Sequence, residues 1–222
     1  MKLASFAYLF CFPFLLITAC TRVQTEKWPN GNLKSEITMH GGQRNGPARY
    51  WFEDGNIQME CIYKDDMLNG NLTRYFAYPE GAREEQQTYI NDTLDGTDLL
   101  WDRAGNVLIQ SHFLKGKLHG TYHEFYENKL IKAEGSYVNG NIDGLWLYYD
   151  DTGLVVGKGN FTMGNGEQRS FYTGTVKIKM ITRYSNNLKD GAEIEYSPEG
   201  KVLRKRIYFA GNVNEVIETP LP

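Results

Sequence analysis

The sequence has few of the features that define helical, disulfide-rich or strongly charged proteins. After Gly31 its longest glycine-free stretch is the 16 residues from Thr175 to Asp190. Each glycine inside a helix costs about 1 kcal/mol, which excludes an all-α fold. The 24 basic and 27 acidic residues leave a net charge of only −3, which excludes a basic nucleic-acid-binding protein and an acidic tail. The aromatic share of 14% and hydrophobic share of 41% are enough for a packed core of strands and turns.

Only three cysteines are present, and two of them lie in or directly after an apolar N-terminal segment. Residues 1–19 carry a single charge, at Lys2, and Pro13 interrupts their apolar run. This pattern is typical of a secretion signal rather than a membrane-spanning helix. Residues 17–20 (ITAC) resemble the lipobox of bacterial lipoproteins, which implies cleavage before Cys20 and a diacylglycerol on its sulfur. The alternative is an ordinary signal peptide followed by an incidental thiol.

The remaining cysteine content limits how the mature chain is held together. With Cys11 removed in the leader and Cys20 acylated, Cys61 has no partner and an intrachain disulfide is excluded. We predict a lipoprotein signal peptide over residues 1–19 and a short tether over residues 20–27. The protein is then exported and lipid-anchored in the bacterial cell envelope, at the outer membrane or the periplasmic face.

Glycines preceded by Asn, Asp or His recur with a period near 24 residues, and we call them the hallmark glycines. They are Gly46, Gly70, Gly96, Gly120, Gly144, Gly166 and Gly191. Asn, Asp and His tolerate positive φ, so each such residue with its hallmark glycine predicts a tight chain reversal. The other end of the reversal is expected about four residues earlier, where a similar residue type recurs. A second reversal is expected about nine residues after each hallmark glycine, as at Asp54-Gly55.

Aromatic residues form two columns between these reversals. The first column, five residues after each hallmark glycine, is Trp51, Tyr75, Trp101, Phe125, Tyr149, Phe171 and Tyr196. The second column, seven residues before the next hallmark position, is Tyr63, Tyr89, Phe113, Tyr137, Tyr184 and Tyr208. Each unit therefore predicts two short antiparallel strands, and stacking aligns equivalent rings, each worth about 2 to 3 kcal/mol when buried.

The best-preserved units resemble the MORN repeat. Residues 137–144 (YVNGNIDG) and 113–120 (FLKGKLHG) match its pattern of an aromatic followed by two spaced glycines, and residues 144–153 (GLWLYYDDTG) are similar to a bacterial variant described as antitoxin-like. The resemblance covers nearly everything from Trp28 to Val216. It implies an all-β fold, an elongated antiparallel sheet of stacked β-hairpins with a period of about 24 residues. We place this repeat domain at residues 28–217 and a C-terminal tail at residues 218–222.

Three units depart from the repeat pattern. Two residues are added around Pro79, a glycine is missing at Asn128-Lys129, and the unit between Gly157 and Gly166 is shortened. At the shortened unit the strand register is open to a slip.

The histidines do not form a convincing metal site. Of His40, His112, His119 and His123, the last two lie four residues apart, which is about 13 Å on an extended strand. His119 also occupies the Asn or Asp position of its repeat. We therefore predict no metal site.

No catalytic constellation is recognisable either. Carboxylates are spread over the units, and Glu193 and Glu195 alternate as on a solvated strand face. Cys61 occupies a column of small or polar residues, which indicates packing rather than nucleophilic chemistry. We predict no catalytic residue and no cofactor, although paired acids for glycoside hydrolysis stay open.

The units that begin at Gly120 and Gly144 carry aromatics on both strand faces. Tyr122, Tyr126, Trp146 and Tyr148 lie opposite the first-column residues Phe125 and Tyr149. If the first column marks the core, the other four rings are candidates for contact with a partner. The alternative is that curvature or a loop covers both faces. The basic run Arg204, Lys205 and Arg206 fits lipid headgroups or a solvated edge strand equally.

Together these observations favour a non-enzymatic envelope lipoprotein that acts as a repeat-based scaffold. Its expected partner is a protein or an envelope polymer, with membrane contact through acylated Cys20 and no nucleic acid or small-molecule cofactor. An antitoxin or immunity-type inhibitor of a toxin is a second hypothesis, implied by the family resemblance alone. A third is an envelope hydrolase with its site in the groove of the sheet.

Overall fold

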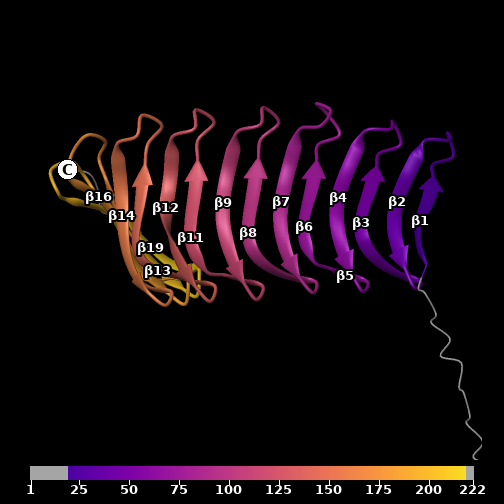
Figure 1. Ribbon diagram of the computed structural model, residues 1–222. Helices are drawn as coiled ribbons and strands as arrows, with labels where there is room; N and C mark the ends of the chain where they lie inside the picture. Colours follow the sequence, from indigo (N-terminus) through magenta and orange to yellow (C-terminus); the bar gives the residue numbers. More distant parts are fainter. Residues whose placement is uncertain (1–19, 219–222) are drawn as a thin grey trace, which may run out of the picture.

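The computed structural model describes residues 20–218, and all regular structure among them is β-strand (Figure 1). No helix capable of crossing a membrane occurs in this part of the chain. The strands are β1 (Thr21–Lys27), β2 (Leu33–His40), β3 (Gln43–Trp51), β4 (Ile57–Lys64), β5 (Met67–Leu68), β6 (Gly70–Tyr75), β7 (Arg83–Ile90), β8 (Thr93–Trp101), β9 (Val107–Leu114), β10 (Lys117–Leu118), β11 (Gly120–Phe125), β12 (Ile131–Val138), β13 (Asn141–Tyr149), β14 (Val155–Thr162), β15 (Asn165–Phe171), β16 (Ile178–Ser185), β17 (Leu188–Tyr196), β18 (Val202–Phe209) and β19 (Asn212–Glu218).

The strands pair antiparallel in chain order and together form one long open sheet, with two interrupted strands. The short pieces β5 and β10 continue into β6 and β11, because β4 pairs with both β5 and β6, and β9 with both β10 and β11. The sheet curls at its C-terminal end, where β19 passes behind β13 in Figure 1. The predicted all-β fold of stacked hairpins is confirmed.

The predicted tether at residues 20–27 is wrong, because most of it is strand β1. Thr21 lies opposite His40 and Glu26 opposite Ser35 in a regular antiparallel pair. An edge strand needs only backbone hydrogen bonds to its neighbour, so β1 lacks the aromatic columns that mark the other units. The predicted signal peptide at residues 1–19 and residues 219–222 of the predicted tail lie outside the described residues.

The tight reversals lie about four residues before the hallmark glycines. Gly41-Gly42 and Asp65-Asp66 form two-residue turns with positive φ at both positions, the geometry of a type I′ hairpin. Gly46 lies within the returning strand, with a φ of 123°, next to a register shift between Ile37 and Met39. The Asn-Gly pair therefore forms a β-bulge and not the turn, which corrects the sequence-based expectation.

The polar residue before a hallmark glycine joins one hairpin to the next. The Asp143 carboxylate accepts a hydrogen bond of 2.8 Å from the backbone N–H of Met163, and the Asn165 side-chain oxygen accepts one of 3.2 Å from that of Asn186. Each donor lies in or beside the tight turn of the following hairpin. Asn45 and Asn69 make the link in the opposite direction, because their side-chain amides donate hydrogen bonds of 2.8 Å to the side-chain oxygens of Asp65 and Asn91. These positions therefore require a short polar side chain that can hydrogen-bond the next turn.

The shortened unit keeps its register. β14 and β15 pair without a register shift, so the slip left open by the sequence does not occur. Its two missing residues remove the bulge, and Gly166 lacks the positive φ of the other hallmark glycines. Asn187 spans the shortened turn: its side-chain oxygen accepts a hydrogen bond of 2.9 Å from the N–H of Ile142.

The two faces of the sheet differ in burial. We call the face that carries Ala48, Cys61, Leu72, Trp146 and Phe161, all at most 5% exposed, the inner face. The opposite, outer face carries a continuous row of cross-strand neighbours. From β2 to β19 this outer row is Glu36, Arg49, Glu60, Thr73, Gln86, Leu99, Gln110, His123, Glu134, Leu147, Lys158, Arg169, Ile181, Ile194, Lys205 and Ile217.

The core lies on the inner face. Large side chains near the two ends of neighbouring strands lean toward each other there and cover the small residues between them. The hydroxyls of Tyr50 and Tyr63 lie 3.5 Å apart, and these residues flank the cross-strand pair Ala48 and Cys61. A single sheet thus buries a core without a second layer.

The two aromatic columns lie on opposite faces, although rings within one column share a face. Tyr75 of the first column donates a hydrogen bond of 2.8 Å to Glu60 of the outer row. Tyr63 of the second column belongs to the core cluster with Cys61. The first column therefore does not mark the core face, which corrects the assignment made from Phe125 and Tyr149.

Candidate binding surface

Three of the four predicted contact residues lie together inside the core. Trp146 is 5% exposed, and its ring centroid lies 5.5 Å from that of Tyr122, 5.2 Å from that of Tyr137 and 6.3 Å from that of Tyr148. A Cβ at Gly135 would overlap the Trp146 ring. The glycine therefore makes room for the indole, and Trp146 is a core residue, not the exposed contact residue predicted from the sequence.

The other predicted aromatics are partly buried. Burial raises the pKa of Tyr148 strongly and that of Tyr122 to about 12. Tyr126 stands apart from them and donates a hydrogen bond of 2.8 Å to the Tyr149 carbonyl. The Trp146 cluster therefore fits the alternative interpretation from the sequence, in which the protein itself covers these rings.

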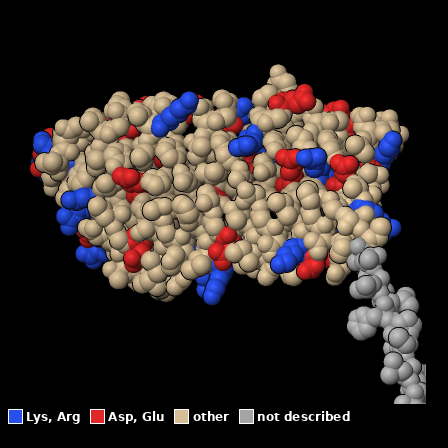
Figure 2. All heavy atoms as spheres, in the orientation of Figure 1, with Lys and Arg blue, Asp and Glu red and all other residues tan. Residues whose placement is uncertain are grey.

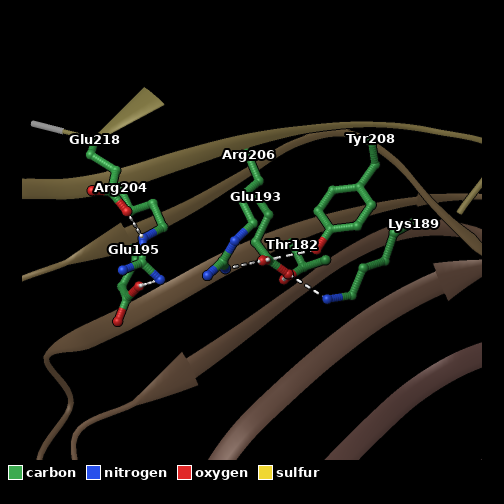
Figure 3. A network of polar contacts seen from close by, with 8 residues as sticks. All are labelled: Thr182, Lys189, Glu193, Glu195, Arg204, Arg206, Tyr208 and Glu218. Atoms are coloured by element: carbon green, nitrogen blue, oxygen red, sulfur yellow. Dashed lines mark hydrogen bonds and ion pairs between the residues drawn. The ribbon is translucent and has the colours of Figure 1, made fainter. Parts of the chain in front are cut away.

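Further along the inner face, the aromatic cluster gives way to a charge network (Figure 3). Glu193 is 3% exposed and accepts hydrogen bonds from Arg206 at 2.8 Å and from Thr182 at 3.2 Å, and it also pairs with Lys189. The Tyr208 hydroxyl lies 3.4 Å from the same carboxylate. This burial contradicts the expectation that Glu193 alternates with Glu195 on a solvated face.

The cations around Glu193 determine its ionisation. Burial alone would raise its pKa, but the hydrogen bonds from Lys189 and Arg206 bring the pKa below the ordinary value of a glutamate. Glu193 is thus a satisfied buried carboxylate. The neighbouring Arg204 pairs with Glu195 at 3.8 Å and Glu218 at 3.3 Å.

The basic run at residues 204–206 is divided between the two faces by strand alternation. Arg204 and Arg206 point to the inner face, where carboxylates hold them. Lys205 lies opposite Ile194 and Ile217 in the outer row. Only Lys205 of the three contributes to the outer surface.

An apolar groove lies at the outer face between two long turns. Its volume is about 500 Å³, and its lining is Val176, Lys177, Ile178, Ile181, Tyr196, Ser197, Pro198, Glu199 and Gly200. Val176 is 91% exposed, which leaves a branched aliphatic side chain in water at the lip of the groove. We call this the C-terminal groove.

The turn that carries Val176 is one residue longer than a regular one. Tyr172 N–H bonds the carbonyl of Lys177, whereas in a regular unit Phe52 N–H bonds the carbonyl of Asn56. The extra residue is visible in the sequence, because Phe171 and Ile178 are seven residues apart where Trp51 and Ile57 are six. This spacing is the signal from which the groove could have been found.

Basic side chains surround the apolar floor. Lys177 lines the groove, and Lys201 follows Gly200 of the lining. Lys205 is the cross-strand neighbour of Ile194, which in turn lies opposite Ile181. None of the three forms an ion pair within residues 20–218. In the view of Figure 2, several Lys and Arg lie at the end of the sheet that holds β14 and β16, with Asp and Glu among them, and both charges mix along the rest of the face.

The cysteines and histidines that the sequence offered as candidates do not gather into a site among the described residues. Cys20 is exposed, immediately before β1, and Cys61 is buried in the core. His119 Nδ1 lies 3.4 Å from the N–H of Asn139, so it serves as the acceptor of its repeat. Among the described residues, no three His, Cys, Asp or Glu side chains are placed to hold a metal ion.

A family model described as a MORN repeat variant matches residues 23–40 and 44–65. These segments span most of β1 to β4, so the matched part coincides with the first hairpins of the sheet. No curated protein matches the chain. MORN repeats are generally non-catalytic, repeat-based binding modules, and the first units of this chain are similar to them.

Proposed function

We propose that the protein is a non-enzymatic lipoprotein of the bacterial cell envelope, acylated at Cys20, that holds a protein partner in its C-terminal groove. The observation that carries the proposal is the groove itself, where apolar side chains are exposed on a face whose outer row is polar from β2 to β7. The antitoxin and hydrolase alternatives gain no observation of their own from residues 20–218.

The position of Cys20 supports this geometry. Cys20 precedes Thr21, which lies opposite His40, the last residue before a tight turn. An acyl chain on Cys20 would therefore leave the sheet at its tight-turn edge. The groove lies between long turns at the other ends of the strands, so it would face away from the bilayer.

Acylation and partner contact are tested separately. Wild type and Cys20→Ala are expressed in a bacterium with an alkyne-tagged fatty acid, and we expect label and membrane fractionation only for wild type. A label retained on Cys20→Ala contradicts the anchor.

Partner contact is tested with a photo-crosslinking amino acid at Val176. The matched control carries it at Leu145, which is 54% exposed and also on the outer face. We expect a discrete crosslinked protein from Val176 alone. Equal products from both positions, or none from Val176, contradict the proposed scaffold function.

A further inference from the structure

We infer that the C-terminal groove takes an extended, acidic segment of a partner protein that also carries bulky apolar side chains. The inference rests on the proposed function and specifies the chemistry of the partner at the same site.

The floor of the groove requires apolar side chains from its occupant. Ile178, Ile181 and Tyr196 line it, and Val176 stands at its lip with 91% of its surface exposed. Ile194 continues the apolar surface as the cross-strand neighbour of Ile181. A polar occupant would lose hydration against these side chains without gaining hydrogen bonds.

The rim requires negative charge. Lys177 and Lys201 both lie close enough to Glu199 to lower its pKa, after the larger effect of the hydrogen bond from the Ser197 hydroxyl. Lys205 lies beside the floor as the cross-strand neighbour of Ile194, and Glu199 is the one carboxylate in the lining of the groove. The lysines are long and hydrated, so they favour carboxylates spread along a segment over one buried ion.

The extent of the basic surface favours a peptide over a membrane or a nucleic acid. Arg169, the next cation along the outer row, is already paired with Glu167 at 2.8 Å, and Arg49 further away with Glu60 at 3.0 Å. Lys158 lies between them in the outer row without an ion pair, but its cross-strand neighbours are Leu147 and the paired Arg169. Along the outer row, free cations therefore do not form a continuous run of the kind that a membrane surface or a nucleic acid would need. A volume of about 500 Å³ holds a few side chains, which fits the apolar residues of a short extended segment.

The test uses a displayed library of random short peptides and the full chain in a neutral detergent. The variant is Lys177→Glu/Lys201→Glu, and the matched control is Lys115→Glu/Lys117→Glu, two exposed lysines at the tight-turn edge. We expect enriched peptides to combine Asp or Glu with Leu, Ile, Phe or Trp. Their affinity should fall at least about tenfold in the variant and stay unchanged in the control.

Each other outcome overturns the inference. These outcomes are no enrichment, enrichment of neutral or basic peptides, equal loss in both double variants, and binding of anionic phosphatidylglycerol vesicles that disappears only in the groove variant. Val176→Ser tests the apolar contribution separately. We expect it to lower the affinity for the enriched peptides without changing the salt dependence of their binding. If crosslinking from Val176 succeeds while the peptide test fails, the scaffold function stands and only the acidic chemistry is wrong.

Discussion

The aromatic cluster of β11 to β14 and the charge network of β16 to β18 occupy corresponding rows of the inner face. In the first, Trp146 packs among tyrosines over glycines; in the second, Glu193 is held between Lys189 and Arg206. Backbone pairing is the same in both regions. The repeat therefore fixes the strands and bulges, while the inner-face content of each unit varies independently.

The contrast also separates two sources of stability. Apolar burial at Trp146 is insensitive to pH, whereas the Glu193 network depends on the ionised carboxylate. Variants in the two regions should therefore respond differently to acid.

The largest effect is expected from Trp146→Ala. Removing a buried indole leaves a cavity, and the free energy of unfolding should fall by about 3 to 5 kcal/mol. Urea unfolding followed by circular dichroism measures this loss. Leu145→Ala is the control, because this side chain is exposed and its loss should cost under about 1 kcal/mol. Equal losses in the two variants would show that the aromatic cluster is not a core.

An intermediate effect is expected from Glu193→Gln. It removes the charge between two cations, and we expect a loss of about 2 to 3 kcal/mol at pH 7. Because the folded-state pKa of Glu193 is lowered, its contribution is present above the unfolded value of 4.5 and is lost as pH falls through the folded-state pKa.

Urea unfolding of wild type and Glu193→Gln at neutral and acidic pH measures this dependence. The difference between the two proteins should shrink once the pH falls below about 4.5. The loss of unfolding free energy caused by Trp146→Ala should stay constant over the same pH range. A Glu193→Gln difference that is independent of pH would contradict the role of the carboxylate charge.

The smallest effect is expected at the links between hairpins, which both regions share. Asp143→Ala removes the acceptor for the N–H of Met163, and Asn165→Ala removes that for Asn186. Each should cost about 1 kcal/mol, measured by urea unfolding. A loss at one position only would mean that the links do not act alike in the two regions.

The sequence predicted the fold class and the period because aromatic columns and turn residues repeat regularly. It misplaced the tight turns, because Asn45-Gly46 is compatible with both a turn and a bulge, and only pairing decides between them. It missed β1, since Thr21–Lys27 is exposed throughout and joins the sheet by backbone hydrogen bonds.

The candidate site was less predictable. Trp146 was assigned to the surface because strand alternation shows which residues share a face but not which face is covered. The room for its ring comes from Gly135 on the neighbouring strand, which no local pattern connects to it. The groove depends on one inserted residue, and its exposed valine has no chemical motif.

Because the sheet is open, the distance between its two ends follows from the number of hairpins. Neighbouring strands are about 4.8 Å apart, so each hairpin adds about 10 Å along the curved contour. If β1 is anchored and β16 and β17 carry the cargo, the number of intervening hairpins sets how far from the attachment point that cargo is presented. Gain or loss of a single unit would change this reach in fixed steps and leave both termini chemically unaltered.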